Sequence, residues 1–99
     1  MSILETTIET KACEYAKSLG ITAKKLFLAS ERSWPDRTFL YRGHVMFIEF
    51  KQLKEKAEPL QQYTINLLRQ NGFVVYICDN LAQSKVLIKE WREYVDNHQ

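Results

Sequence analysis

The sequence predicts an α/β domain with a mixed central sheet flanked by helices, in the element order αβββαβα. Two observations lead to this prediction. Strand-like segments on either side of Arg42-Gly43 can form a tight hairpin, because glycine supplies the backbone freedom that such a turn needs. A helix-like segment then separates the third strand from the fourth, and a crossover of this kind makes the two strands parallel.

The elements follow from apolar spacing and from the residues that begin or end them. In the first helix, apolar side chains recur every three or four residues, and Gly20 is placed to end it. Pro59 suits the first position of the second helix, and the apolar run FVVYIC indicates a buried strand. The predicted bounds are, in chain order, a helix over 3–19, strands over 24–29, 36–42 and 44–51, a helix from Pro59 to near Asn71-Gly72, a strand over 73–78 and a helix over 81–96.

Length and composition exclude several classes of protein. The chain has 99 residues, which predicts a single domain over 1–99. Hydrophobic residues make up 45% and charged residues 26%, as in a globular and not a disordered protein. No apolar run reaches the roughly 18 residues needed to span a bilayer. The N-terminal segment also lacks the basic region of a secretory signal, so we expect no membrane partner.

The two cysteines, Cys13 and Cys78, predict a reducing compartment. A disulfide-stapled secreted domain of this size would carry about four or more. Neither cysteine has a second cysteine or a histidine at the spacing of zinc ligands. We therefore expect two reduced thiols and a cytoplasmic location.

The hairpin turn brings two carboxylates together. If Arg42 and Gly43 form the loop, paired positions sum to 85, and Asp36 falls opposite Glu49 with Cβ atoms about 5 Å apart. Strand alternation places Lys51 on the same face as Glu49. Carboxylates this close repel each other, and a hard divalent cation such as Mg²⁺ relieves the conflict. A lysine beside such a cation can orient an attacking water or stabilise charge on a phosphate. The arrangement predicts a site for metal-assisted phosphodiester hydrolysis.

Four short motifs resemble the VRR-NUC (virus-type replication-repair nuclease) domain of the PD-(D/E)XK superfamily, and the αβββαβ order resembles its restriction-endonuclease-like core. The resemblance covers roughly residues 4–80, and Ser33 stands where the family usually has glycine. The matching segments are Leu4-Glu5-Thr6-Thr7-Ile8-Glu9, Ser33-Trp34-Pro35-Asp36-Arg37, Glu49-Phe50-Lys51 and Pro59-Leu60-Gln61.

The resemblance implies roles for individual residues. Asp36 and Glu49 would be metal ligands, with the backbone carbonyl of Phe50 as a third oxygen, and Lys51 would be the catalytic lysine. Glu5 matches the family's leading glutamate and would act on the metal directly or through water. Glu9, one turn later, is the alternative helix acid. Gln61 matches a glutamine that supports the site or contacts the phosphate. The implied cofactor is Mg²⁺, for which Mn²⁺ would substitute.

A net charge of +2 is too small by itself to indicate nucleic-acid binding, but basic residues gather around the predicted site. If the substrate is DNA, these side chains would contact phosphates without reading bases. Trp34 could stack on a base or pack the loop, and packing is favoured. The candidate DNA-binding residues are Lys24, Lys25, Arg32, Arg37, Arg42, Lys54 and Lys56.

The predicted function is a Mg²⁺-dependent, structure-specific DNA endonuclease of repair and recombination. Stand-alone members of the family resemble Holliday-junction resolvases of bacterial or phage-infected cells and are often homodimers. Trp91, Tyr94 and Val95 on the last helix predict a surface that a second copy could bury. The alternatives are a flap, nick or general DNA nuclease, a non-catalytic DNA-binding module, and a protein-interaction domain that uses the last helix.

Overall fold

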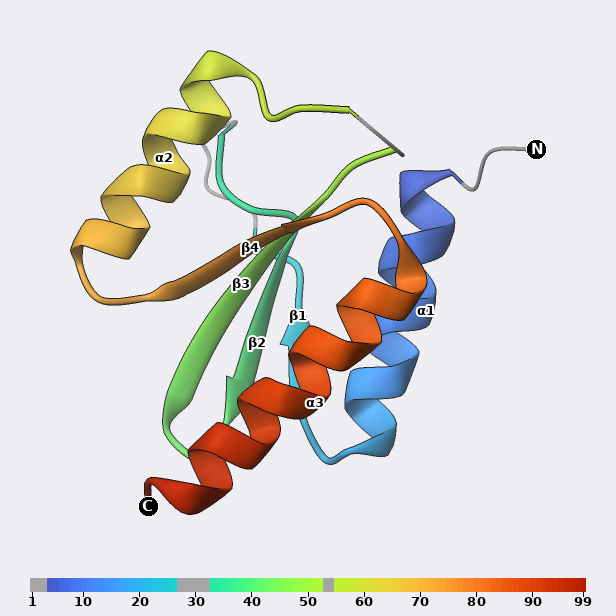
Figure 1. The fold of residues 1–99 in the computed structure, drawn as a ribbon, viewed down its shortest axis with the longest axis vertical. Helices are drawn as coiled ribbons and strands as arrows, with labels where there is room; N and C mark the ends of the chain where they lie inside the picture. The colour runs from blue at the N-terminus through green and yellow to red at the C-terminus, as the bar shows by residue number, and fades with distance from the viewer. Residues whose placement is uncertain (1–3, 27–32, 53–54) are drawn as a thin grey trace.

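The computed structural model describes residues 4–26, 33–52 and 55–99 and confirms the predicted α/β class. A four-stranded mixed sheet lies between helices (Figure 1). Across the described residues the elements are α1 (Glu5–Ser18), β1 (Thr22–Lys24), β2 (Arg37–Tyr41), β3 (His44–Phe50), α2 (Pro59–Gln70), β4 (Val74–Cys78) and α3 (Leu81–Asn97).

The sheet has the order β1-β2-β3-β4, antiparallel except for the parallel pair β3 and β4. Arg42 and Gly43 have φ angles of 48° and 83°, as the two central residues of a tight type I′ hairpin turn require. Tyr41 pairs with His44 and Arg37 with Ile48, so the predicted register and the predicted parallel crossover are both confirmed.

Each face of the sheet has its own hydrophobic core. Helices α1 and α3 cover one face and α2 covers the other (Figure 1). Along β3, Met46, Ile48 and Phe50 belong to the core with α1 and α3, whereas Val45 and Phe47 belong to the core with α2. The same alternation directs Glu49 and Lys51 to the α2 side, where β3 ends.

The first strand differs from its prediction. It was expected over 24–29, but β1 begins at Thr22 and ends at Lys24, and Leu26 is 44% exposed. Residues 27–29 lie outside the described part of the chain. The reason is the turn at Gly20, whose φ of 81° returns the chain at once to the edge of β2. Pairing can therefore begin as soon as the helix ends.

The apolar face of the last helix is already covered. Trp91 and Val95 are 5% and 0% exposed, because α3 packs this stripe against α1 and the sheet. Tyr94 is exposed and stacks on His98. The expectation that Trp91, Tyr94 and Val95 form one uncovered surface is therefore wrong.

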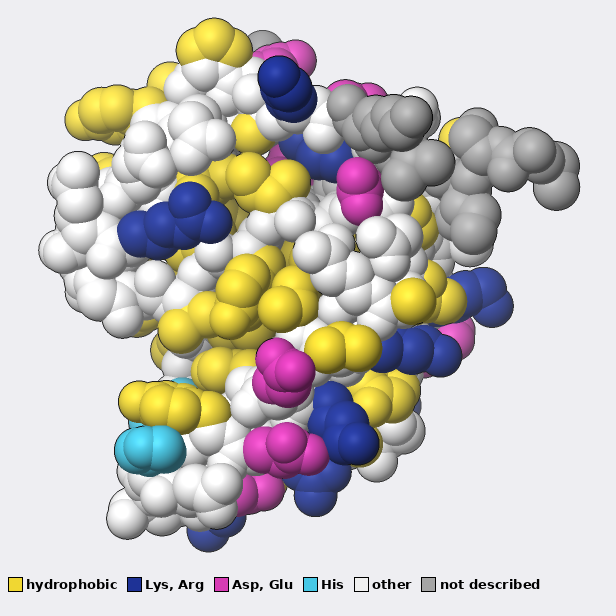
Figure 2. All heavy atoms as spheres, viewed as in Figure 1, with side chains coloured by type: hydrophobic (Ala, Val, Ile, Leu, Met, Phe, Trp, Pro, Cys, Tyr) yellow, Lys and Arg dark blue, Asp and Glu magenta, His cyan; other side chains and the backbone are white. Residues whose placement is uncertain are grey.

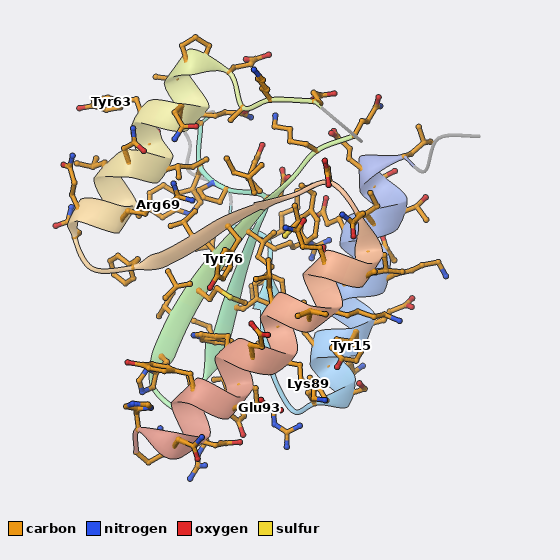
Figure 3. The ribbon with its side chains drawn as sticks, viewed as in Figure 1. Tyr15, Tyr63, Arg69, Tyr76, Lys89 and Glu93 are labelled. Carbon is orange, nitrogen blue, oxygen red and sulfur yellow. The ribbon has the colours of Figure 1, made fainter. Side chains whose placement is uncertain are left out.

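Helix α2 carries three of the large apolar side chains that are exposed. Leu60 and Tyr63 are more than half exposed, and Leu67 is 45% exposed. Tyr63 points away from the sheet (Figure 3). Among the described helices, none is both long and apolar enough to cross a bilayer.

Candidate active site

The carboxylates of Asp36 and Glu49 meet where β2 begins and β3 ends. The main-chain N–H of Asp36 donates to Oε1 of Glu49 at 3.1 Å. The main-chain N–H of Phe50 donates to Oδ2 of Asp36 at 2.8 Å. Each carboxylate is thus held by the backbone of the other strand, and the hairpin register brings the two acids together as the sequence predicts.

Burial disfavours the charged forms of both acids, and repulsion from Asp36 further disfavours the charged form of Glu49. Burial, and then the charge of Asp36, raise the pKa of Glu49 from 4.5 to about 7, although Lys51 opposes the shift. Burial also raises the pKa of Asp36, while the Phe50 N–H and the charge of Lys25 lower it. A cation placed between the two carboxylates would remove this repulsion.

Lys51 and Gln61 complete the polar cluster beside Glu49. The Lys51 ammonium lies 3.3 Å from Oε2 of Glu49 and donates to Oε1 of Gln61 at 2.7 Å. Gln61 Nε2 in turn donates to Oε2 of Glu49 at 2.9 Å. The main-chain N–H of Lys51 donates to the carbonyl of Cys78, which ties the end of β3 to β4.

The first turn of α2 orients Gln61. Its Oε1 accepts a hydrogen bond from the Lys51 ammonium and another, at 3.2 Å, from the main-chain N–H of Glu58, the residue that precedes Pro59. Since the Oε1 and the Nε2 of Gln61 are both hydrogen-bonded, its side chain has little rotamer freedom. The start of α2 therefore sets where the Lys51 ammonium lies.

Of the two candidate helix acids, Glu9 is the one whose charge acts on Asp36. It is 7% exposed and accepts a hydrogen bond and ion pair from Nε of Arg37, and its charge raises the pKa of Asp36. Glu5 is half-buried one turn nearer the helix end, and within the described residues it forms no hydrogen bond or ion pair with the site. Spacing alone could not separate them, because both lie on the helix face that carries Ile8.

Asp36 and Glu49 could hold a divalent metal ion. The described residues contain no cluster of three or more His, Cys, Asp or Glu side chains arranged for a metal. Two carboxylates fit Mg²⁺, which usually keeps several waters and takes one or two protein carboxylates together with substrate phosphate. The third oxygen suggested for the metal, the Phe50 carbonyl, belongs to the residue whose N–H holds Asp36.

The predicted basic residues are spread over more than one region. Lys24, Lys25 and Lys56 are exposed, and the effect of Lys25 on the pKa of Asp36 places it near the site. Arg42 lies at the hairpin turn, at the opposite end of β2 from Asp36, and pairs with Asp96. The structure therefore does not bring Arg42 to the site.

Two of the seven predicted DNA contacts, Arg32 and Lys54, lie outside the described residues.

The loop before Asp36 packs against α2. Trp34 meets Phe47 edge-on with ring centroids 5.5 Å apart, in agreement with the packing alternative. The hydroxyls of Ser33 and Thr64 are 2.5 Å apart and buried. Sequence reasoning missed Thr64, because a threonine on the buried side of a helix carries no signal of its partner.

Comparison with known proteins reveals relatives by structure and not by sequence. No protein-family model matches the chain, and no match is found among curated proteins. A solved structure described as a VRR_NUC domain is similar with a TM-score of 0.80 and 28% identity, over 86% of this chain and 94% of that one. A second, described as a VRR_NUC domain protein, has a TM-score of 0.75 and 18% identity, over 90% and 88% of the two chains. The similarity thus extends over nearly the whole of each domain.

Proposed function

We propose that this chain, whose structure is similar to VRR-NUC domains over nearly its whole length, is a nuclease of that family and hydrolyses DNA phosphodiester bonds as a Mg²⁺-dependent endonuclease. The observation that carries the proposal is the cluster formed by Asp36, Glu49 and Lys51 at the open end of the hairpin, opposite its turn. The paired carboxylates can bind the metal ion, and the cationic donor beside them can stabilise the negative charge that develops on the phosphate.

Each residue of the cluster has a task that its contacts support. Asp36 and Glu49 would hold the cation, with the Phe50 carbonyl beside them. A bound Mg²⁺ would act as a Lewis acid on the phosphate and supply a more acidic water. Lys51, fixed by Gln61, orients the attacking water or donates to a phosphate oxygen. The water oxygen bonds to phosphorus, the bond from phosphorus to the 3′ oxygen breaks, and the 3′ oxygen leaves.

Glu9 is the helix acid that we assign to this site in preference to Glu5. Its burial and its effect on Asp36 support the choice. Arg37 holds the Glu9 carboxylate in position through Nε. Glu9 would therefore act on the metal directly or through a water.

The substrate that we propose is branched DNA, and specifically the four-way junction. Such a junction has two-fold symmetry, which a homodimer with two active sites would match. The apolar side chains exposed on α2, rather than those of α3, offer a surface for the second copy. Flaps, nicks and linear duplex are the competing substrates for the same chemistry.

A panel of end-labelled DNAs tests the proposal directly. Junction, flap, nicked duplex, linear duplex and single strand would be incubated with Mg²⁺, with Mn²⁺ or with a chelator. We expect cleavage only with a metal, and fastest on the junction. Binding without cleavage under every condition would instead identify a non-catalytic DNA-binding module.

A further inference from the structure

A groove runs between α1 and β1, adjoining the candidate site but not part of it. Its volume is about 470 Å³, and its walls come from the middle and end of α1, from β1 and from Arg37. Figure 1 shows β1 lying beside the second half of α1. The lining includes the hydroxyl side chains of Thr10 and Thr22 and the cations of Lys17 and Lys24.

Arg37 belongs to both the groove and the site. Its Nε donates to the buried Glu9, while no hydrogen bond to its Nη atoms is found among residues 4–26, 33–52 and 55–99. A guanidinium has five N–H donors in a planar fork that matches phosphate oxygens. One side of Arg37 can therefore hold Glu9 while the other receives an anion in the groove.

The lysines of the groove have charges that the protein itself does not neutralise. In the described part of the chain, neither the Lys17 nor the Lys24 side chain forms an ion pair or hydrogen bond. By contrast, two arginines at the hairpin turn and on α3, Arg42 and Arg92, both pair with Asp96. Figure 2 shows acidic and basic side chains intermingled over α3. Glu14 is the acid among the lining residues of the groove. Glu9, which does not line it, forms an ion pair with Arg37.

The groove has the length of a short stretch of DNA backbone. Lys24 pairs with Thr38, two strand residues from Asp36, or about 7 Å along β2. Lys17 is eight helix residues beyond Glu9, or about 12 Å along α1. The two lysines thus lie at different distances from the carboxylates, so they would contact different phosphates of one strand.

We propose that this groove binds backbone phosphates of the DNA on one side of the cleaved bond, with Arg37 and Lys24 nearest the cut and Lys17 furthest from it. The proposal rests on the proposed function, since it presumes a DNA substrate. It gives the path of the strand, away from the hairpin turn and Arg42. It also adds Lys17 as a contact that the sequence did not indicate.

Salt dependence of DNA binding tests the path without relying on cleavage. Junction binding would be measured in Ca²⁺ from low to moderate salt, with the DNA checked for integrity on the same gel. The variants are Lys17→Ala, Lys24→Ala and both together, and the matched control is Lys11→Ala, an exposed lysine of α1 outside the groove lining.

Each groove lysine should lower the slope of log affinity against log salt by about one, and the double variant by about two. At 0.15 M salt the affinity should fall about fivefold for each lysine. Lys11→Ala should match the wild type. Unchanged slopes in the double variant, or an equal loss in Lys11→Ala, would overturn the proposal.

A neutral methylphosphonate beside the mapped cut locates the contact. On the groove side it should weaken the wild type and leave Lys24→Ala unaffected, and on the other side of the cut it should weaken both proteins equally. If the two positions behave alike, the path is wrong even though cleavage continues. If the wild type binds DNA but never cuts it, the proposed function fails. The slopes of log affinity against log salt would still decide whether the groove binds DNA.

Discussion

Asp36 and Glu49 form a pair in which burial raises the pKa of both carboxyls, and the charge of Asp36 raises the pKa of Glu49 further. We expect Asp36→Asn and Glu49→Gln to abolish cleavage while the protein still folds and binds DNA. Removing one of two close negative charges relieves repulsion, so the melting temperature should not fall. Cleavage assays beside thermal melts would check this, and wild-type rates in either folded variant would rule out the site.

The raised pKa of Glu49 makes the stability of the metal-free protein depend on pH. Its folded pKa of about 7 lies above the usual 4.5, so its contribution to stability is complete below pH 4.5 and is lost as pH rises through 7. We expect the melting temperature in chelator to fall between about pH 5 and 8. Glu49→Gln should flatten this dependence, whereas Glu93→Gln on the outer side of α3 should preserve it.

Lys51 is expected to serve turnover and not metal affinity, because it is a cation beside a cation site. Lys51→Ala should lower the cleavage rate by about a hundredfold or more, on the scale of losing a preorganised charge. Calorimetry should show Mg²⁺ binding unchanged or tighter. A collapse of Mg²⁺ affinity would mean that Lys51 organises the carboxylates instead.

At the scale of elements, α2 joins the two halves of the site. Gln61 contacts Glu49 on β3 and Lys51 just after it, while Thr64, one turn later, contacts Ser33 in the loop that leads to Asp36. A single rigid helix thus positions groups that come from two separate parts of the chain.

The hydrogen bond between Ser33 and Thr64 should show energetic coupling. Ser33→Gly and Thr64→Val remove the same contact, so the double variant should lose less stability than the sum of the two, with a coupling of about 0.5–3 kcal/mol. Denaturant unfolding would measure it. Asn66→Ala, on the exposed side of α2, should combine additively with Ser33→Gly. Additivity in both pairs would show that the contact is not coupled.

The accuracy of the sequence-based expectations differs from one element to the next for physical reasons. The hairpin register was predictable, because a two-residue turn allows one alignment and so places Asp36 beside Glu49. The bounds of β1 were not, because its pairing depends on where the Gly20 turn directs the chain. The depth of Glu9 likewise depends on how α1 lies on the sheet, which helical periodicity does not reveal.

At the scale of the whole molecule, α2 exposes three large apolar side chains, whereas Trp91 and Val95 of α3 are buried. We expect sedimentation at micromolar concentration to give twice the 11.7 kDa chain mass, with junctions cut in preference to linear duplex. Tyr63→Glu on the outer side of α2 should give a monomer, since a buried charge opposes association. Tyr94→Glu, at a tyrosine that is also exposed but lies on α3, is the control.

A wild-type monomer under these conditions, or equal cleavage of junction and duplex, would contradict the resolvase proposal. The proposed metal-dependent chemistry would stand in either case, because it depends on Asp36, Glu49 and Lys51.

The tie between Lys51 and the carbonyl of Cys78 has a consequence for the order of folding. Hairpins joined by tight turns close within microseconds, so β2 and β3 can bring Asp36 and Glu49 together early. Lys51 and Cys78 are 27 positions apart (78 − 51), and β4 joins β3 only after α2 has crossed over. Such non-local parallel pairing is slow. The repelling acids therefore meet before the crossover has positioned Gln61 and Lys51, and a divalent cation present during refolding should speed the late step.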